Sequence, residues 1–308
     1  MGWVRTPPSE SARELRGRSL GATKTVYLIR HAEGFHNEGA SSGAREEFTF
    51  ILSRRGTEYG NEAYADARLT RRGWGQCEHF RRTMERREAM GKMLERCELV
   101  VVSPLTRAME TCAGMFGTAD GEGEVLMAPT RAVEMKSCER PAMRRDERMC
   151  RKKKFLALEM VREQIGGNPC DRRRTIDEYR TEFPGIDFSL VEENEDVLWK
   201  PGKENREPEN VLRQRCRQFL NWCFDREETD IIVVTHSAFM CNLMVEYCLG
   251  GHQPCEVVKE HLYPWPKNCE CRPLVIVDTR RASPSKHPFY HAGGDPEPEE
   301  YELAPHEE

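Results

Sequence analysis

The 308-residue sequence lacks any apolar run that approaches the roughly 20 residues a membrane-spanning helix needs. Its first 24 residues have no apolar core of the kind found in a secretory signal, and no Asn-x-Ser/Thr glycosylation acceptor occurs anywhere in the chain. The 13 cysteines are odd in number and follow no framework spacing, which favours reduced thiols. These absences predict a cytoplasmic protein with no membrane partner; an organelle address in the first residues stays an open alternative.

A regular metal-binding motif is also missing. The candidate ligands Cys255, His261, Cys269 and Cys271 are separated by five, seven and one residues, whereas zinc sites usually pair their cysteines about two to four residues apart. We therefore predict no metal and no cofactor, with zinc at this cluster as the minor alternative.

Negative charge is concentrated at one end of the chain. Residues 281–308 contain seven acidic and two basic residues, which account for the formal net charge of -5 and leave residues 1–280 formally neutral. A neutral body argues against nucleic acid as a partner. The basic run at 144–154 has acidic residues beside it and is interpreted as a solvated insert.

Four short apolar runs, at 25–30, 98–103, 230–235 and 273–278, alternate with helix-like segments. Nearly continuous apolar character is typical of strands buried on both faces. The alternation predicts an α/β three-layer sandwich with a mostly parallel central sheet flanked by helices. Helices are expected at 71–96, from Ser103-Pro104 onward, and at 151–164, 175–182, 210–226 and 238–249.

The chain is predicted to hold one folded domain at 24–280 between an N-terminal tail at 1–23 and an acidic disordered tail at 281–308. Residues from about 116 to 206 are rich in glycine, proline and charge, with no strong strand after Val125-Leu-Met127. We expect an inserted cap region there.

Polar residues stand at the ends of three predicted strands, as Arg30-His31, Ser103-Pro104 and Thr235-His236. The carboxyl ends of parallel strands meet at one edge of the sheet, where α/β proteins bind their ligands. An arginine fork suits phosphate oxygens, and a neutral imidazole nitrogen can attack phosphorus. Arg107 would lie one helical turn beyond the second strand, at the same edge. Each motif alone could be structural, but their joint occurrence predicts a phosphate site.

These motifs, in this order, resemble the histidine phosphatase superfamily, which includes phosphoglycerate mutases, over roughly residues 24–280. Further matching segments are Leu69-Thr-Arg-Arg-Gly73, Arg162-Glu-Gln-Ile-Gly166, Asn168-Pro-Cys-Asp-Arg-Arg-Arg-Thr175 and Phe183-Pro-Gly-Ile-Asp-Phe188. The last two look especially similar to plant and fungal phosphoglycerate-mutase-like proteins.

The resemblance implies that His31 is the nucleophile and that Glu163 is the general acid and base. The implied catalytic set is His31, Glu163, His236, Arg30 and Arg107. The implied substrate-binding set is Arg30, Asn37, Arg107, His236 and Ser237. Rivals for the acid are Glu134, Glu139 and Glu159, but the Arg-Glu-x-x-Gly context favours Glu163. The neighbouring Arg172-Arg-Arg174 could contact the rest of an anionic substrate or belong to the cap surface, and His36 is interpreted as pocket wall.

The leading interpretation is a metal-independent hydrolase that acts on a small phosphorylated metabolite through a phosphohistidine. A phosphoglycerate-type mutase is the first alternative, which the replacement of Glu-Ser-x-Trp-Asn by Glu33-Gly-Phe-His-Asn37 disfavours. A catalytically weak regulator that binds phosphorylated partners is the second. Ala32 stands where many superfamily members have glycine, but it is small enough to keep hydrolysis possible.

Overall fold

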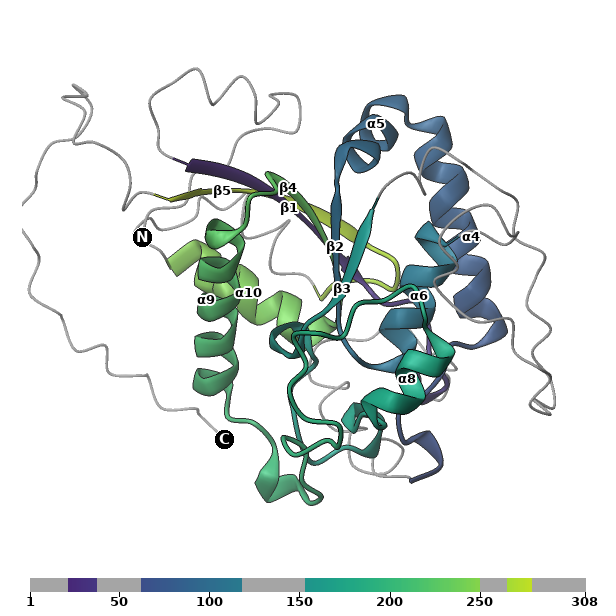
Figure 1. Cartoon of the computed structure of the whole chain (residues 1–308), viewed down its shortest axis with the longest axis vertical. Coiled ribbons are helices and arrows are strands. Elements are labelled where there is room, and N and C mark those ends of the chain that lie inside the picture. The colour runs from purple at the N-terminus through teal and green to yellow at the C-terminus, as the bar shows by residue number, and fades with distance from the viewer. Residues whose placement is uncertain (1–21, 38–61, 118–152, 250–264, 279–308) are drawn as a thin grey trace, which may run out of the picture.

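Five strands form the central sheet in the order β3-β2-β4-β1-β5 (Figure 1). The computed structural model of the chain describes residues 22–37, 62–117, 153–249 and 265–278. The strands are β1 (Ala22–Arg30), β2 (Leu99–Val102), β3 (Lys154–Ala157), β4 (Asp230–Thr235) and β5 (Cys271–Asp278). The first four run parallel, and β5 pairs antiparallel with β1 at the edge. The predicted α/β fold class is confirmed.

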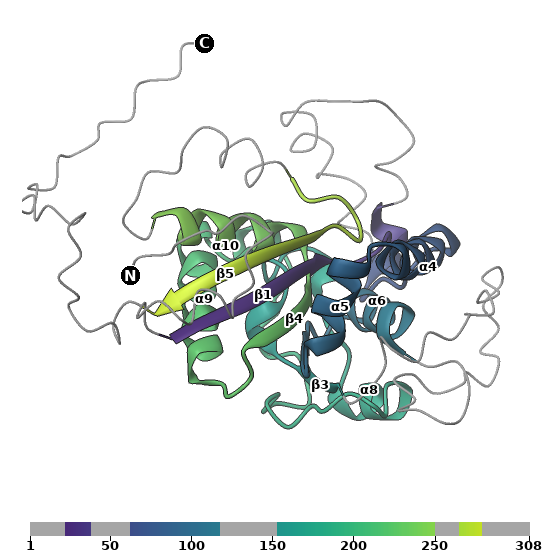
Figure 2. The same cartoon turned by 90° about the horizontal axis from the view of Figure 1, so that it is seen from above.

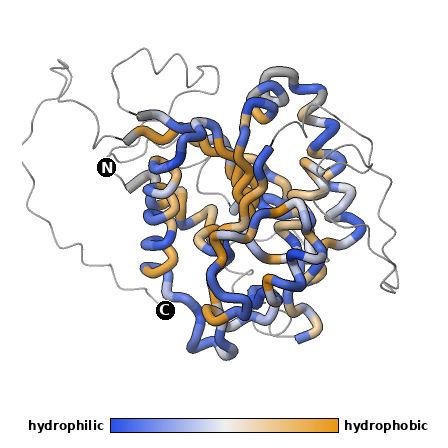
Figure 3. Tube along the Cα trace, viewed as in Figure 1, coloured by the Kyte–Doolittle hydropathy of each residue, from blue (hydrophilic) through white to orange (hydrophobic). Residues whose placement is uncertain are grey.

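Helices cover both faces of the sheet, as the view from above shows (Figure 2). Alternate residues of β1 point to opposite layers: Val26 and Leu28 pack with α9 (Glu209–Asp225) and α10 (Ser237–Leu249). Tyr27 and Ile29 pack with α4 (Arg71–Arg86) and α6 (Thr106–Phe116). Since both faces of the central strands are buried, their middle residues are apolar (Figure 3).

The predicted helices at 175–182, 210–226 and 238–249 are confirmed, within a residue at each end, as α8 (Ile176–Glu182), α9 and α10. Thr175 begins α8 with a reciprocal capping box to Glu178. The helix expected at 71–96 is instead two helices, α4 and α5 (Glu88–Arg96), because the backbone leaves the helical region at Arg87.

The helix predicted at 151–164 is wrong. Residues 154–157 form β3, and Glu159–Val161 form the short 3-10 helix η2. Phe155 packs on one face of the sheet and Leu156 on the other, so pairing with β2 overrides the helix propensity of this lysine- and leucine-rich stretch. The expectation of no strong strand after Val125-Leu-Met127 fails for the same reason. β3 belongs to the central sheet although it lies inside the range assigned to the cap.

The helix start expected at Ser103-Pro104 is also wrong, because α6 begins at Thr106. The carboxylate of Asp66, from a distant part of the chain, accepts hydrogen bonds from the Thr106 amide (2.8 Å) and hydroxyl. It thereby takes the place of a local cap. Ser103 is left to contact His236 instead.

Several sequence expectations lie outside the described residues, among them residues 1–21, the acidic tail, residues 125–127, and Cys255 and His261 of the zinc candidate. Ala22 and Thr23, which the prediction assigned to the N-terminal tail, belong to β1. Within the part of the chain that is described, no group of histidine, cysteine and acidic side chains is arranged to hold a metal ion. None of the described helices is long and apolar enough to cross a bilayer. The division into tails, core and cap stays a prediction.

A buried carboxylate joins α6 to the segment before α4. Glu110 accepts hydrogen bonds from the Leu69 amide at 2.7 Å and from the Arg68 guanidinium at 2.8 Å, and Arg68 also pairs with Glu182 of α8. Burial raises the pKa of Glu110 from 4.5 to about 7, against the opposing effect of Arg68. Glu110 therefore joins these elements, and the folded state favours its protonated form more than the unfolded chain does.

We expect the substitution Glu110→Gln to change how stability depends on pH. Because the pKa of Glu110 is raised in the folded state, its stabilising contribution is complete below pH 4.5 and is lost as pH rises to about 7. The amide does not titrate, so wild type should lose roughly 1–3 kcal/mol relative to the variant across this interval. Urea unfolding at pH 4.5, 5.5, 6.5 and 7.5 measures the difference. Parallel stability curves would contradict the assignment.

Candidate active site

The register of the parallel strands brings their polar ends to one edge. Arg30 of β1 lies opposite Thr235 of β4, and Val102 of β2 lies opposite both Val234 and Ala157. The residues that follow each strand are therefore neighbours in space. The sequence prediction of a common edge is confirmed.

A cavity of about 70 Å³ opens at this edge. Its wall includes six of the predicted site residues: Arg30, His31, Asn37, Arg107, Glu163 and Ser237. His36 also lines it, as the sequence predicted. His236 does not line the cavity but stands behind it, fully buried, with its ring centroid 5.0 Å from that of His31.

The backbone sets the tautomer of His31. Its Nδ1 lies 2.6 Å from the carbonyl oxygen of Ala32. Because a carbonyl only accepts hydrogen bonds, Nδ1 carries the proton and Nε2 keeps its lone pair. Burial, with Arg107 and Arg30 nearby, holds the pKa of His31 well below 6.5, so the ring stays neutral at physiological pH.

The antiparallel strand β5 brings its preceding loop to the same edge. Pro266 accepts a 2.7 Å hydrogen bond from Arg30 Nη1, and Asn268 Nδ2 donates to the His31 carbonyl at 2.9 Å. The Cys269 amide donates to the Arg30 carbonyl at 3.0 Å. This loop fixes both the guanidinium and the backbone of the Arg30-His31 pair.

Hydrogen bonds of Glu33 connect the loop after His31 to the start of α4. The Thr70 hydroxyl donates to the Glu33 carboxylate at 2.9 Å and accepts from the Gly73 amide at 3.0 Å. A side chain at Gly73 would place Cβ 2.2 Å from the Glu33 carbonyl. The Leu69-Thr-Arg-Arg-Gly73 segment therefore positions the catalytic loop and does not contact the cavity itself.

Arg107 shares a carboxylate with an arginine that sequence reasoning missed. Arg107 donates to Asp171 at 2.8 Å and to the Cys170 carbonyl. Arg206 donates to the other Asp171 oxygen at 2.7 Å and to the Gly166 carbonyl at 2.8 Å. Although burial opposes it, Arg206 and Arg107 hold the pKa of Asp171 below its ordinary value. Both Arg206 and Asp171 line the cavity.

Glu163 faces the amino end of α10. One carboxylate oxygen lies 3.2 Å from the Ala238 amide and 3.3 Å from the Ser237 hydroxyl, and the other accepts from the Gln164 amide at 2.9 Å. The helix terminus favours a negative group at this point. Of the rival acids, Glu159 is bound to Arg162 and Arg173, and Glu134 and Glu139 lie outside the described residues.

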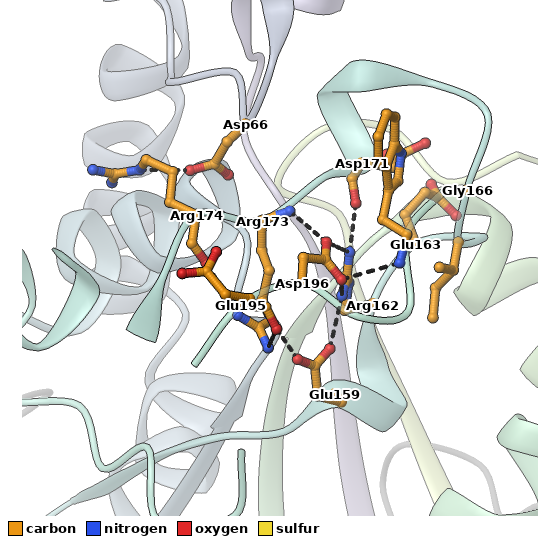
Figure 4. Close-up of polar contacts among 12 residues, drawn as sticks. Asp66, Glu159, Arg162, Glu163, Gly166, Asp171, Arg173, Arg174, Glu195 and Asp196 are labelled. Carbon is orange, nitrogen blue, oxygen red and sulfur yellow. Dashed lines mark hydrogen bonds and ion pairs between the residues drawn. The ribbon is translucent and has the colours of Figure 1, made fainter. Parts of the chain in front are cut away.

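The segment that carries Glu163 is held by buried arginines (Figure 4). Arg162, fully buried, forms a two-pronged ion pair with Asp196 at 2.9 and 2.7 Å and donates to the Asp171 carbonyl at 2.6 Å. Arg215 of α9 donates to the Glu163 carbonyl at 3.0 Å. Gly166 has a φ of +81°, and a Cβ there would lie 2.2 Å from the Asn205 carbonyl. These contacts explain the Arg-Glu-x-x-Gly pattern.

The arginine triplet at 172–174 does not line the cavity. Arg173 pairs with Glu159 at 2.6 Å, and Arg174 pairs with Asp66 at 3.0 Å. Arg172 pairs with the exposed Glu62 and lies over the ring of Trp199. The hypothesis that this triplet contacts the substrate is therefore not supported, and Arg206 supplies the extra positive charge at the cavity.

His236 has an incomplete set of hydrogen bonds. Its Nε2 lies 2.7 Å from the Ser103 hydroxyl, and its Nδ1 has no hydrogen-bond partner among the residues that the structure describes. Burial, followed by Arg107 and His31, holds the pKa of His236 well below 6.5. His236 is thus a neutral ring beside His31 with one unpaired nitrogen, and it would reach a group in the cavity only after a local rearrangement, because it does not line the wall.

Comparison with curated proteins finds plant relatives along most of the chain. The chain is 36% identical over 259 residues to "Phosphoglycerate mutase-like protein" of Arabidopsis thaliana, covering 84% of this chain and 86% of that protein. It is 34% identical over 262 residues to "Phosphoglycerate mutase-like protein 1" of the same plant, covering 84% and 83%. No family model matches the chain.

Among solved structures, the ecdysone phosphate phosphatase from Bombix mori in complex with tungstate matches with a TM-score of 0.43 and 16% identity, over 89% of this chain and 98% of that one. A mycobacterial glucosyl-3-phosphoglycerate phosphatase matches with a TM-score of 0.41 and 15% identity, over 82% and 90%.

We expect Gly166→Ala to displace the Glu163 segment. The positive φ and the 2.2 Å approach to Asn205 both oppose a side chain, so the free energy of unfolding should fall by about 2–4 kcal/mol. Gly75→Ala is the matched control: it adds a Cβ with no neighbour within 4 Å in the interior of α4 and should raise stability by up to about 1 kcal/mol. Equal effects of the two changes in urea unfolding would refute the constraint.

Proposed function

This chain belongs to the phosphoglycerate mutase-like proteins, and on that premise we propose that it hydrolyses small phosphomonoesters through a phosphohistidine formed on His31. The observation that supports this most directly is the hydrogen bond from His31 Nδ1 to Ala32. It leaves an unprotonated nitrogen on a residue of a cavity whose wall includes three arginines and two carboxyl side chains.

In the first step, His31 Nε2 attacks phosphorus and the ester P–O bond breaks. Glu163 gives its proton to the departing oxygen, so the alcohol leaves neutral. The imidazole of the phosphohistidine gains positive charge, and the Ala32 carbonyl, which accepts from Nδ1–H, stabilises it.

In the second step, water attacks phosphorus and the P–N bond breaks. The Glu163 carboxylate takes the proton of the water, His31 returns to its neutral form, and inorganic phosphate leaves. The guanidinium groups of Arg30, Arg107 and Arg206 offset the negative charge that spreads over the phosphoryl oxygens in both transition states. Because guanidinium groups supply this charge, we propose that the reaction needs no metal.

We expect His31→Ala to abolish hydrolysis of an aryl phosphate and Glu163→Gln to lower kcat by about 10²–10⁴-fold. The matched control is His79→Ala, which removes an exposed imidazole from α4. Wild-type turnover should survive EDTA. Activity that persists in His31→Ala, or that EDTA removes, would contradict the proposed mechanism. Movement of phosphate within one substrate, with little release of inorganic phosphate, would instead indicate a mutase.

The pH dependence tests the state of the nucleophile. Attack needs neutral His31, and its lowered pKa keeps the neutral form populated as pH falls through 6.5. We therefore expect NMR titration of the imidazole C–H signals, assigned with a His31→Gln variant, to show neutral His31 at pH 6. A midpoint at or above 6.5 would contradict the burial and arginine effects described above.

A further inference from the structure

The described wall of the cavity carries little surplus charge. Three arginines (Arg30, Arg107 and Arg206) and two carboxylates (Glu163 and Asp171) line it, while the buried imidazoles of the site stay neutral. The net charge of this wall is therefore +1 with both acids ionised. It becomes +2 when Glu163 carries the proton that it would donate to the leaving group. That value matches one phosphoryl dianion.

The arginines behind this wall add no excess positive charge. Arg162 and Arg173 are balanced by Asp196 and Glu159. Arg215 is balanced by Glu207 at 2.6 Å. A second anionic group on the substrate would thus enter a partly buried site with no matching cation among the described residues.

The guanidinium groups of Arg107 and Arg206 already form hydrogen bonds within the protein. Both terminal nitrogens of Arg107 donate to protein oxygens. One terminal nitrogen of Arg206 donates to both Asp171 and the Gly166 carbonyl. Asp171 thus neutralises part of the positive charge of Arg107 and Arg206, and the remaining positive charge is needed to bind the phosphoryl oxygens.

Apart from its arginines and carboxylates, the described wall is neutral and includes the aromatic ring of Trp265. We assign this neutral part to the leaving group. Trp265 has the only large apolar side chain among the described wall residues. It is half-buried, packs against the core layer under α10, and directly precedes Pro266, whose carbonyl accepts from Arg30. Its ring is therefore firmly placed beside the phosphate-binding arginine. The cavity volume of about 70 Å³ accommodates several water-sized groups, which is enough for a phosphoryl group.

Building on the proposed hydrolase function, we propose that the site selects phosphomonoesters whose leaving group is uncharged and packs on Trp265, and that it discriminates against esters with a second negative charge beside the phosphate. The charge of the wall limits how much negative charge the site accepts, and Trp265 contributes contact area to the alcohol. Trp265 is thus a specificity-determining residue, and Asp171 sets the charge of the wall.

The test compares two esters that differ by one carboxylate, glycerol 3-phosphate and 3-phosphoglycerate, with phosphate release as the readout. Wild type should hydrolyse glycerol 3-phosphate with at least about tenfold higher kcat/KM, and the ratio should shrink as salt screens the repulsion. Asp171→Asn adds one net positive charge to the wall, so the ratio should move toward 3-phosphoglycerate, whatever the absolute rates.

Trp265 is tested with an aryl phosphate beside glycerol 3-phosphate. Trp265→Ala should raise KM for the aryl ester by about tenfold more than for the glycerol ester, and Trp265→Phe should restore most of the difference. Trp222→Ala, on α9 and stacked on Phe219, is the control for loss of a half-buried tryptophan outside the cavity. It should affect both esters equally.

The outcomes separate the two proposals. Equal or preferred hydrolysis of 3-phosphoglycerate would overturn the charge selectivity and leave the hydrolase intact. Equal effects of Trp265→Ala on both esters would overturn the role of the ring. If no ester were hydrolysed, the proposed function would fall, and this inference with it.

Discussion

The shared carboxylate of Asp171 is the interaction on which the site depends. Arg107 comes from α6, next to the central sheet, and Arg206 comes from the segment before α9, and one buried carboxylate binds them both. Without Asp171, two guanidinium groups would face each other across a small cavity with no opposite charge between them. The backbone carbonyl of Asp171 also accepts a hydrogen bond from the fully buried Arg162, which directly precedes Glu163 in the chain. Asp171 therefore fixes the positions of the cations directly and that of the acid through the backbone.

The sequence predicted those parts of the site that a single strand determines. Arg30-His31 and His236 stand at the ends of buried strands, and because these strands, β1 and β4, are parallel neighbours, their ends lie together. The strands could be predicted from the sequence because helices cover both faces of the sheet, which makes the apolar runs of the strands nearly continuous. α8 could also be read, because its capping box from Thr175 to Glu178 is local. In each case the determinants lie within a few residues of the element they specify.

The parts that sequence reasoning missed are determined by distant partners. The sequence of β3 favours a helix. Pairing with β2 and packing against the layers on both faces of the sheet make it a strand. α6 starts later than expected because Asp66, 40 residues upstream, caps it. Arg206 and Trp265 carry no local signal at all, since each reaches the cavity through contacts with Asp171 or with the edge of the core. The arginine triplet at 172–174 gave a misleading signal, because its local charge suggests a contact with an anionic substrate. In the structure, Arg173 and Arg174 are paired with Glu159 and Asp66.

In the proposed mechanism, positive charge and nucleophilicity reside on different side chains of the site. Guanidinium groups hold their charge at any pH the protein meets, so the attraction for phosphate does not depend on protonated imidazoles. Burial together with the nearby arginines then keeps His31 and His236 neutral, which leaves a lone pair free to attack. An exposed histidine would mix the two roles, because the protonated form that attracts phosphate is the form that cannot attack it. Burying the histidines resolves this conflict, because the arginines supply the positive charge while the imidazoles stay neutral.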